Sequence, residues 1–298
     1  MKKGRILFGV GFFLLTISGY SQEYAFKVLA NKGANEFKSG EGWQAVKTGA
    51  SLKAGDELKV SENSYLGLVH SSGKPLEVKT AGNYKVADLA AKVGAGNSGV
   101  MNKTVDFILS SNSAEAKKNR LSATGAVHRG VEGSLHVLLP PPQNASIFGK
   151  TMVVEWESKV AGPYVVTVKN IFEDDLMKIE TPEKSVYLDL NDPKLVHESA
   201  ILVKVTVKGE SNEKIDGNVV KRLSAADQEK IKKSYGEMST DESAFSKFIQ
   251  AGFYEQNGLL IDALTAYEEA IKMAPDVEDF KVARDEFLIR NKLSNGKQ

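Results

Sequence analysis

The sequence predicts a multidomain β plus α protein, in which two β-rich regions precede a helical C-terminal region. Short apolar runs bounded by Gly, Asn, Ser and Pro fill residues 23–80 and 152–220, as antiparallel strands do. Three consecutive prolines at 140–142 cannot join the interior of a sheet, so they mark a boundary between these regions. From Ser224 onward the apolar residues recur at helical spacing.

Residues 1–21 have the three-part pattern of a secretory signal peptide. A basic start at residues 2–5 precedes an apolar run over 6–17, and small residues then lead to Ser21. The run is about 12 residues long, whereas a membrane-spanning helix needs about 20. We expect cleavage after Ser21 and a periplasmic or secreted protein of a Gram-negative envelope, peripheral to the membrane at most. A retained membrane anchor is the alternative.

Composition excludes several classes of protein. Removing the three basic residues of the leader from the 39 in the chain leaves 36 against 38 acidic ones, which lacks the basic footprint of a nucleic-acid binder. The chain has no Cys, so it forms no disulfides, cannot be acylated at a cysteine and performs no thiol catalysis. With four His and no Cys, a structural zinc site is not expected.

The first domain is expected over residues 22–139, as a β-domain with a trailing helical segment. Strands are expected at 24–29, 65–69 and 76–78, each followed or preceded by a turn signal. Helices are expected over Ala87–Val93 and Val100–Leu109. The polar stretch 110–120 is either a loop or a surface helix.

Within this domain, Trp43 is followed by the turn-and-strand unit GASLKAGDEL at 49–58, and then by a strand–Gly–strand unit at 65–78. Its two glycines permit tight turns, Asp56 can accept hydrogen bonds from backbone amides, and its two leucines should point inward. Residues 26–86 therefore resemble the FecR-like periplasmic domain. Founding members of that family transmit iron-siderophore signals, but their anti-sigma segment has no counterpart here. The resemblance implies an envelope binding or assembly module.

The second domain is expected over residues 140–222, as an immunoglobulin- or fibronectin-like β-sandwich. The best strands are Met152–Trp156, Tyr164–Val168, Ser185–Leu190 and Ile201–Val207. Trp156 is interpreted as a core residue. Its alternative is a platform on which a sugar stacks.

The third domain is expected over residues 223–298, as antiparallel helical hairpins. A helix begins near Ser224, and further helices are expected over Asp241–Gln256, Leu260–Met273 and Val277–Asn291. The sequence AGFYEQNGLLIDALTAYEEAIKMAPD carries the small, aromatic and proline positions of a tetratricopeptide repeat, and residues 241–276 resemble one. Lys247 and Gln250 depart from that pattern.

The tetratricopeptide resemblance implies a protein partner on the concave face of the first repeat helix. The candidate contact residues are Phe248, Glu255 and Gln256. For Phe248, packing in the core is the alternative. A single repeat is fewer than the roughly three that a freestanding array needs, so the hairpin should pack against the sandwich or a partner.

No catalytic, metal or cofactor site is predicted. Residues 94–99 fit the dinucleotide pattern GxGxxG, but a helix is expected before them where the fold needs a strand. We therefore expect a non-catalytic, exported binding and scaffold protein that mediates protein–protein interaction in the cell envelope. Two alternatives stay open: a glycan- or peptidoglycan-binding envelope protein, and a hydrolase with an unrecognised site.

Overall fold

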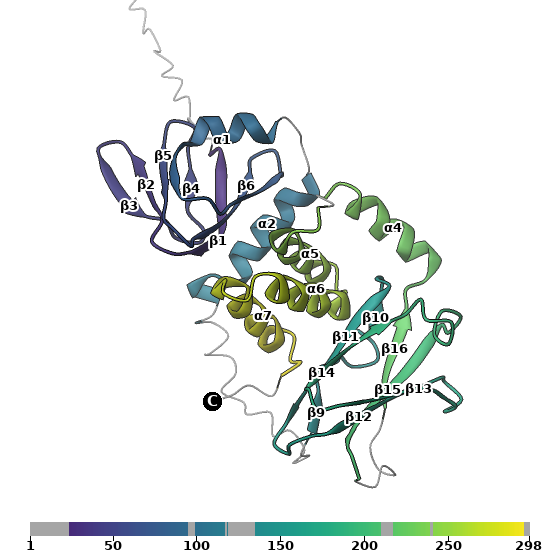
Figure 1. Cartoon of the computed structure of the whole chain (residues 1–298). Helices are drawn as coiled ribbons and strands as arrows, with labels where there is room; N and C mark the ends of the chain where they lie inside the picture. Colours follow the sequence, from purple (N-terminus) through teal and green to yellow (C-terminus); the bar gives the residue numbers. More distant parts are fainter. Residues whose placement is uncertain are drawn as a thin grey trace, which may run out of the picture.

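A computed structural model places a helical unit between two β-rich units (Figure 1). It describes residues 24–94, 99–116, 118, 135–209, 217–238 and 241–294. The β plus α class expected from the sequence is confirmed. The expected signal peptide and most of the glycine-rich stretch after residue 94 lie outside the described residues. Among the described helices, none is both long and apolar enough to cross a membrane.

The N-terminal β-unit consists of two four-stranded antiparallel sheets around one core. Their strand orders are β4-β1-β6-β7 and β3-β2-β5-β8. Leu52 and Leu58 point into the core as expected, and Asp56 accepts the backbone N–H of Lys53 at 2.8 Å. The strands are β1 Phe26–Lys32, β2 Glu36–Ser39, β3 Gly42–Ala45, β4 Ser51–Leu52, β5 Glu57–Val60, β6 Tyr65–His70, β7 Pro75–Val78 and β8 Gly82–Lys85.

Of the two glycines expected at turns in this unit, one is required there. Gly49 has a φ of +89°, which a residue with a Cβ rarely adopts, and its turn leads into β4. Gly55 is absent from the positive-φ residues and has open space where a Cβ would lie. Gly55 nevertheless lies in the expected turn, because the N–H of Asp56 donates to the carbonyl of Lys53 at 3.0 Å, so that turn forms without requiring glycine.

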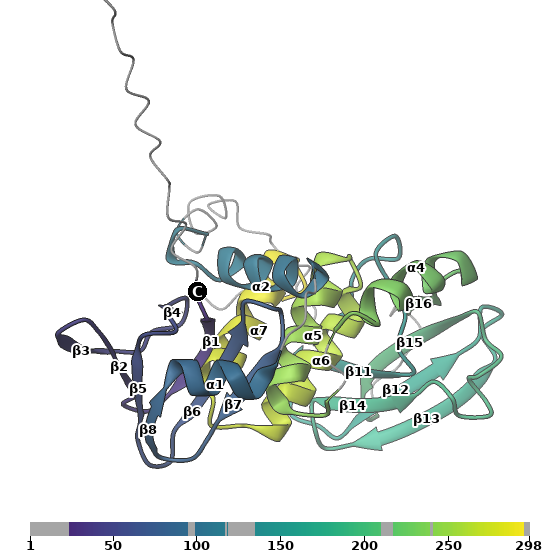
Figure 2. The ribbon, with the colours of Figure 1, turned by 90° about the horizontal axis from the view of Figure 1, so that it is seen from above.

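Two helices follow the N-terminal sheets. They are α1 Val86–Val93 and α2 Gly99–Ser111, each within two residues of its expected bounds. Helix α1 packs on the core of the N-terminal β-unit through Val86 and Leu89. Helix α2 leaves that unit and lies along α5, as both views show (Figures 1 and 2).

The second β-unit has a five-stranded and a three-stranded sheet that enclose one core. Trp156 is buried there, with its ring 5.3 Å from that of Tyr164 edge to face, so the core interpretation of Trp156 is confirmed. The strand orders are β10-β16-β15-β12-β13 and β14-β11-β9, and the β10–β16 pair is parallel. The strands are β9 Leu135–Val137, β10 Ser146–Ile147, β11 Thr151–Ser158, β12 Tyr164–Lys169, β13 Asp175–Thr181, β14 Ser185–Asp189, β15 Ala200–Val207 and β16 Asn218–Arg222.

The helical unit contains α4 Ala225–Tyr235, α5 Ala244–Gln256, α6 Leu260–Met273 and α7 Glu278–Arg290. Ser224 caps α4 by accepting the N–H of Asp227, and Ser243 caps α5 by accepting that of Ser246. The bounds of α6 match the sequence expectation residue for residue. Helix α5 begins three residues later than expected because Ser243 is its cap.

One apolar cluster runs through all three units. It contains most of the buried residues of α5, α6 and α7, together with Leu29 and Tyr65 of the N-terminal β-unit and Val153 of the second. The Tyr65 and Phe280 rings meet edge to face, 5.8 Å apart, although 215 positions separate them. The helices therefore complete the interior between the two β-units.

Polar contacts to the main chain fix the helical unit at both β-units. On one side, Glu77 accepts the N–H of Phe245 at 3.0 Å, and Asp279 accepts that of Asn31 at 2.7 Å. On the other side, Asp262 accepts the N–H groups of Phe148 and Gly149, and Thr265 accepts that of Val153. We call these five hydrogen bonds the latches. Each satisfies a backbone donor that would otherwise be left without a partner.

A candidate partner-binding cleft

The three residues proposed from the sequence to contact a partner lie on α5, and α2 packs along this helix. Gly252 makes that close approach possible. A Cβ built on it would lie 2.4 Å from Cγ1 of Ile108, so α2 rests against bare backbone at this point. The first repeat helix, expected to present an open face to a partner, is thus covered there by an earlier segment of the same chain.

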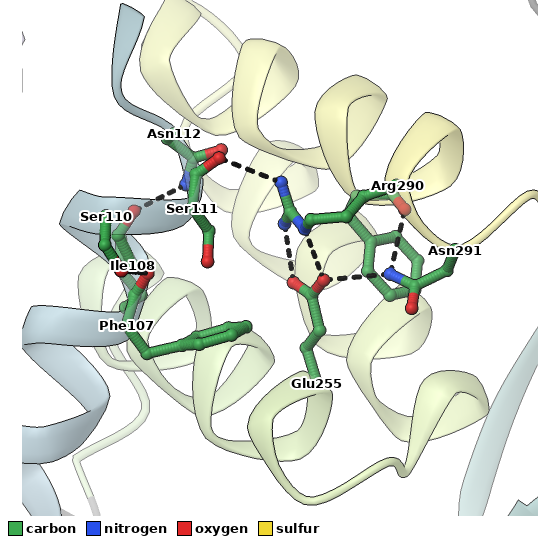
Figure 3. A network of polar contacts seen from close by, with 9 residues as sticks. Phe107, Ile108, Ser110, Ser111, Asn112, Glu255, Arg290 and Asn291 are labelled. Atoms are coloured by element: carbon green, nitrogen blue, oxygen red, sulfur yellow. Dashed lines mark hydrogen bonds and ion pairs between the residues drawn. The ribbon is translucent and has the colours of Figure 1, made fainter. Parts of the chain in front are cut away.

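Glu255 is buried in a polar network that joins three helices (Figure 3). Its two oxygens accept from Nε and Nη2 of Arg290 on α7, at 2.7 and 2.8 Å, and one of them also accepts from Asn291. Arg290 in turn donates to the backbone carbonyl of Ser111 at the end of α2. The pKa of Arg290 is raised: burial lowers it, and the bonds to the Glu255 carboxylate outweigh that effect.

Phe248 and Gln256 have different environments on the same helix. Phe248 is buried, and its ring stacks on that of Phe280 with the centroids 4.8 Å apart. Gln256 is exposed and accepts a hydrogen bond from the Thr104 hydroxyl of α2 at 3.3 Å. Of the three proposed contact residues, only Gln256 therefore lies at the surface.

A cleft of about 490 Å³ opens where α2, α7 and the N-terminal β-unit meet. Phe248, Ile108 and Leu29 form its buried floor, and Val282 of α7 lies at its edge with 36% of its surface exposed. The remaining lining comes from the turn after β3, the end of α2 and the start of α7, through Thr48, Gly49, Leu109, Asn112, Ser113, Ala114, Asp279 and Ala283.

The predicted residues relate to this cleft in three ways. Phe248 supplies part of the floor, and Glu255 supports the wall through Arg290 and Ser111. Gln256 is hydrogen-bonded to Thr104 of α2, and neither of these two residues lines the cleft. Sequence reasoning missed Ile108 and Arg290 because both are distant in sequence. Gly252, a helix-interior glycine at the point of contact, was the available signal of a close approach.

The cleft has an apolar buried floor. Its floor is aliphatic and aromatic, and its Asp279 carboxylate already accepts from Asn31 and from the Thr48 hydroxyl. Within the described ranges, no three His, Asp or Glu residues are placed to hold a metal ion. The cleft therefore offers shape and apolar surface to a ligand.

Converging carboxylates occur at the joints between units rather than in this cleft. Glu155 of β11 and Glu268 of α6 both bind Arg284 of α7. Burial and the neighbouring Glu155 raise the pKa of Glu268, while Arg284 opposes the shift. Burial raises the pKa of Asp262 to about 6, and the hydrogen bonds that its carboxylate accepts from two backbone N–H groups limit that rise. These carboxylates do not line the cleft described above, nor a second cleft that lies beside the three prolines.

A second cleft of about 450 Å³ lies beside the three prolines. Residues 139–142, the start of β16 and Asn291 with Lys292 line it. The stiff proline segment thus runs between the second β-unit and the end of α7.

No protein-family model matches this sequence, and no curated protein matches it.

Proposed function

We propose that the chain is an exported, non-catalytic scaffold of the cell envelope that binds another protein. The single observation that carries the proposal is the continuous apolar core, which the helical unit shares with both β-units. A core of this kind holds two modules in one orientation, and the latches fix that orientation through main-chain groups. A rigid platform of this kind suits assembly of partners rather than turnover of a substrate.

Finer assignments of the three units belong to the same proposal. We interpret the N-terminal β-unit as FecR-like, the second as an immunoglobulin- or fibronectin-like sandwich, and the α5–α6 hairpin as tetratricopeptide-like. In support, the spacing that suggests the repeat gives two helices joined at Asn257–Gly258, and Tyr267 is buried between α5 and α7. The departures at Lys247 and Gln250 leave that hairpin intact. Lys247 instead forms ion pairs with Glu242 and Glu269.

The partner is proposed to insert an apolar side chain into the cleft next to α7. Phe248 takes part as a floor residue, and Glu255 takes part by holding the wall. Val282 is the most informative position because it lines the cleft and is partly exposed. Ile289, two turns later on α7, is also exposed but is not among the cleft residues, and so it provides a matched control.

Affinity capture from crosslinked envelopes tests this proposal. The tagged full-length precursor is expressed, so that the same preparation also reports whether the mature chain begins at Gln22. Val282→Arg should abolish recovery of a reproducible envelope protein, while Ile289→Arg should leave its recovery unchanged. Both variants should unfold at the wild-type temperature, because neither side chain is buried.

Two results would contradict the proposal. Equal recovery from the two variants would remove the cleft as the binding site. Recovery of cell-wall fragments alone, together with cosedimentation of the purified chain with sacculi, would favour the glycan-binding alternative. Deletion of the helical unit is unsuitable as a control because it would remove most of the shared core.

A further inference from the structure

Strand β3 is the outermost strand of its sheet. Among the described strands it pairs only with β2, its four residues are exposed, and both views place it at the end of the molecule (Figures 1 and 2). The sequence Gly42-Trp43-Gln44-Ala45 contains no charge and no proline. Every other described outer strand of four or more residues carries a charged residue, and such residues discourage pairing with another chain.

The hydrogen-bond pattern shows which main-chain groups of β3 face outward. The N–H of Val46 donates to the carbonyl of Asn35 at 2.8 Å, so these two residues form a hydrogen-bonded pair. Pairs alternate along an antiparallel ladder, and therefore Glu36–Ala45 and Lys38–Trp43 are non-hydrogen-bonded pairs. The N–H and C=O groups of Trp43 and Ala45 consequently point away from β2.

The side chains of β3 alternate between the two faces of the sheet. Gln44 is paired with Phe37, which packs against the core of this unit, so Gln44 is on the core side. Trp43 and Ala45 share the solvent side, and Trp43 is 43% exposed. Glu41 lies in the turn before β3 and Lys47 lies two residues beyond its end, so residues of opposite charge flank the strand. Both are exposed, and neither forms an ion pair among the described residues.

We propose that β3 pairs antiparallel with β3 of a second copy of this chain, about a two-fold axis at Gln44. In this register Trp43 of each copy lies opposite Ala45 of the other, and the outward groups of these residues make four main-chain hydrogen bonds. The large indole meets a small methyl group. The antiparallel arrangement also brings the Glu41 end of each β3 next to the Lys47 end of the other, so two pairs of opposite charges approach each other across the interface.

The charge pattern selects a second copy over an unrelated strand. A single slip of the register would put Trp43 on the opposite face from its neighbour, and a parallel arrangement of two copies would place Glu41 beside Glu41. An interface made from two short strands is well below the roughly 1,200 Å² of a stable complex, and so the dimer should be weak and concentration-dependent. The proposal is independent of the cleft and of the scaffold function.

Disulfide trapping tests the register directly, because the chain contains no natural Cys. The Gln44 residues of the two copies would form a non-hydrogen-bonded pair with Cα atoms about 4.5 Å apart, within the range that a disulfide spans. Gln44→Cys should therefore oxidise rapidly to a covalent dimer. Phe172→Cys, at an 80% exposed position on the second β-unit, measures the rate of random collision. Equal rates for the two variants would overturn the proposal.

Two further variants distinguish this pairing from nonspecific association through the hairpin. Adding Ala45→Pro to Gln44→Cys removes an outward N–H without breaking a bond to β2, and it should reduce trapping to the collision rate. Glu41→Lys should weaken noncovalent dimerisation about tenfold in sedimentation equilibrium, since two attractive pairs become repulsive. Adding Lys47→Glu should restore it. Failure of the double reversal to restore dimerisation, or a monomer at every concentration, would refute the pairing.

Discussion

Replacing Glu255 with glutamine removes one charge from the network that joins α5, α7 and α2 while keeping the shape of the side chain. In the wild-type chain, the carboxylate accepts two bonds from Arg290, and the exposed fractions of the two side chains are 4% and 18%. Glutamine has only one side-chain oxygen, so its NH2 group takes the place of the second oxygen and faces an N–H donor of the guanidinium. The buried arginine then loses its counter-charge.

The expected loss follows from this geometry. Removing one partner of a buried ion pair costs about 3–5 kcal/mol. Arg290 is partly exposed and keeps its bond to the Ser111 carbonyl, and glutamine keeps one acceptor, so we expect Glu255→Gln to lower the free energy of unfolding by about 2–3 kcal/mol. Urea unfolding monitored by circular dichroism measures this change. Hydrogen exchange of α2 should rise with it, because the end of α2 is bound through Arg290.

Glu278→Gln is the matched control. This glutamate is on α7, its side chain is 76% exposed and it pairs with Lys281 at 3.7 Å. Exposed pairs of this kind contribute about 0–1 kcal/mol, so the control should be nearly neutral. If Glu255→Gln were as mild as Glu278→Gln, the network would not hold the three helices together, and the reasoning about the wall of the cleft would be refuted.

Three other predictions concern the core and the latches. Gly252→Ala should destabilise the chain by about 1–2 kcal/mol in urea unfolding, because the overlap with Ile108 outweighs the gain in helix propensity; a more stable variant would show that α2 is displaced without cost. Phe248→Ala should cost about 3–5 kcal/mol by the same assay, and a surface-like cost below about 1 kcal/mol would contradict its burial. The Asp262 pKa is about 6 in the folded chain and 3.8 in the reference, so its stabilising contribution is complete below about pH 4 and is lost as the pH rises through 6. The stability of the wild-type chain relative to Asp262→Asn should therefore fall by about 3 kcal/mol from pH 3 to 7, and a constant difference in urea titrations would refute the raised pKa.

The helices were predictable because their signals are local. Ser224 bonds the first turn of α4 and Asn257–Gly258 ends α5, so these bounds follow from neighbouring residues, whereas the cap at Ser243 was not anticipated. Short apolar runs bounded by turn residues predicted β1, β6, β7, β11, β12, β14 and β15 in the same way. No individual strand was named for β2, β3, β8, β9, β10, β13 or β16, which are shorter or more polar. For Trp156 the sequence also indicated the environment, because a tryptophan within an apolar strand usually packs in the core.

The site was less predictable because its contacts join distant parts of the chain. Glu255 has the spacing of a surface position in the repeat pattern, but Arg290 and Ser111 enclose it from 35 and 144 positions away. Nothing near Glu255 in the sequence indicates these partners. Phe248 was correctly assigned an apolar environment under its alternative, core packing, but the cleft above it depends on how α2 packs along α5.

The core shared by the first and last parts of the chain has a consequence for its synthesis. When the N-terminal β-unit has formed, Leu29, Tyr65 and Val69 still lack their neighbours, because Phe280 and the other helix residues of the shared core are made much later. A chain that stops before α7 therefore keeps an apolar surface open to proteases and to aggregation. Only a chain that includes α7 closes that surface, so burial of the first domain waits for the synthesis of α7.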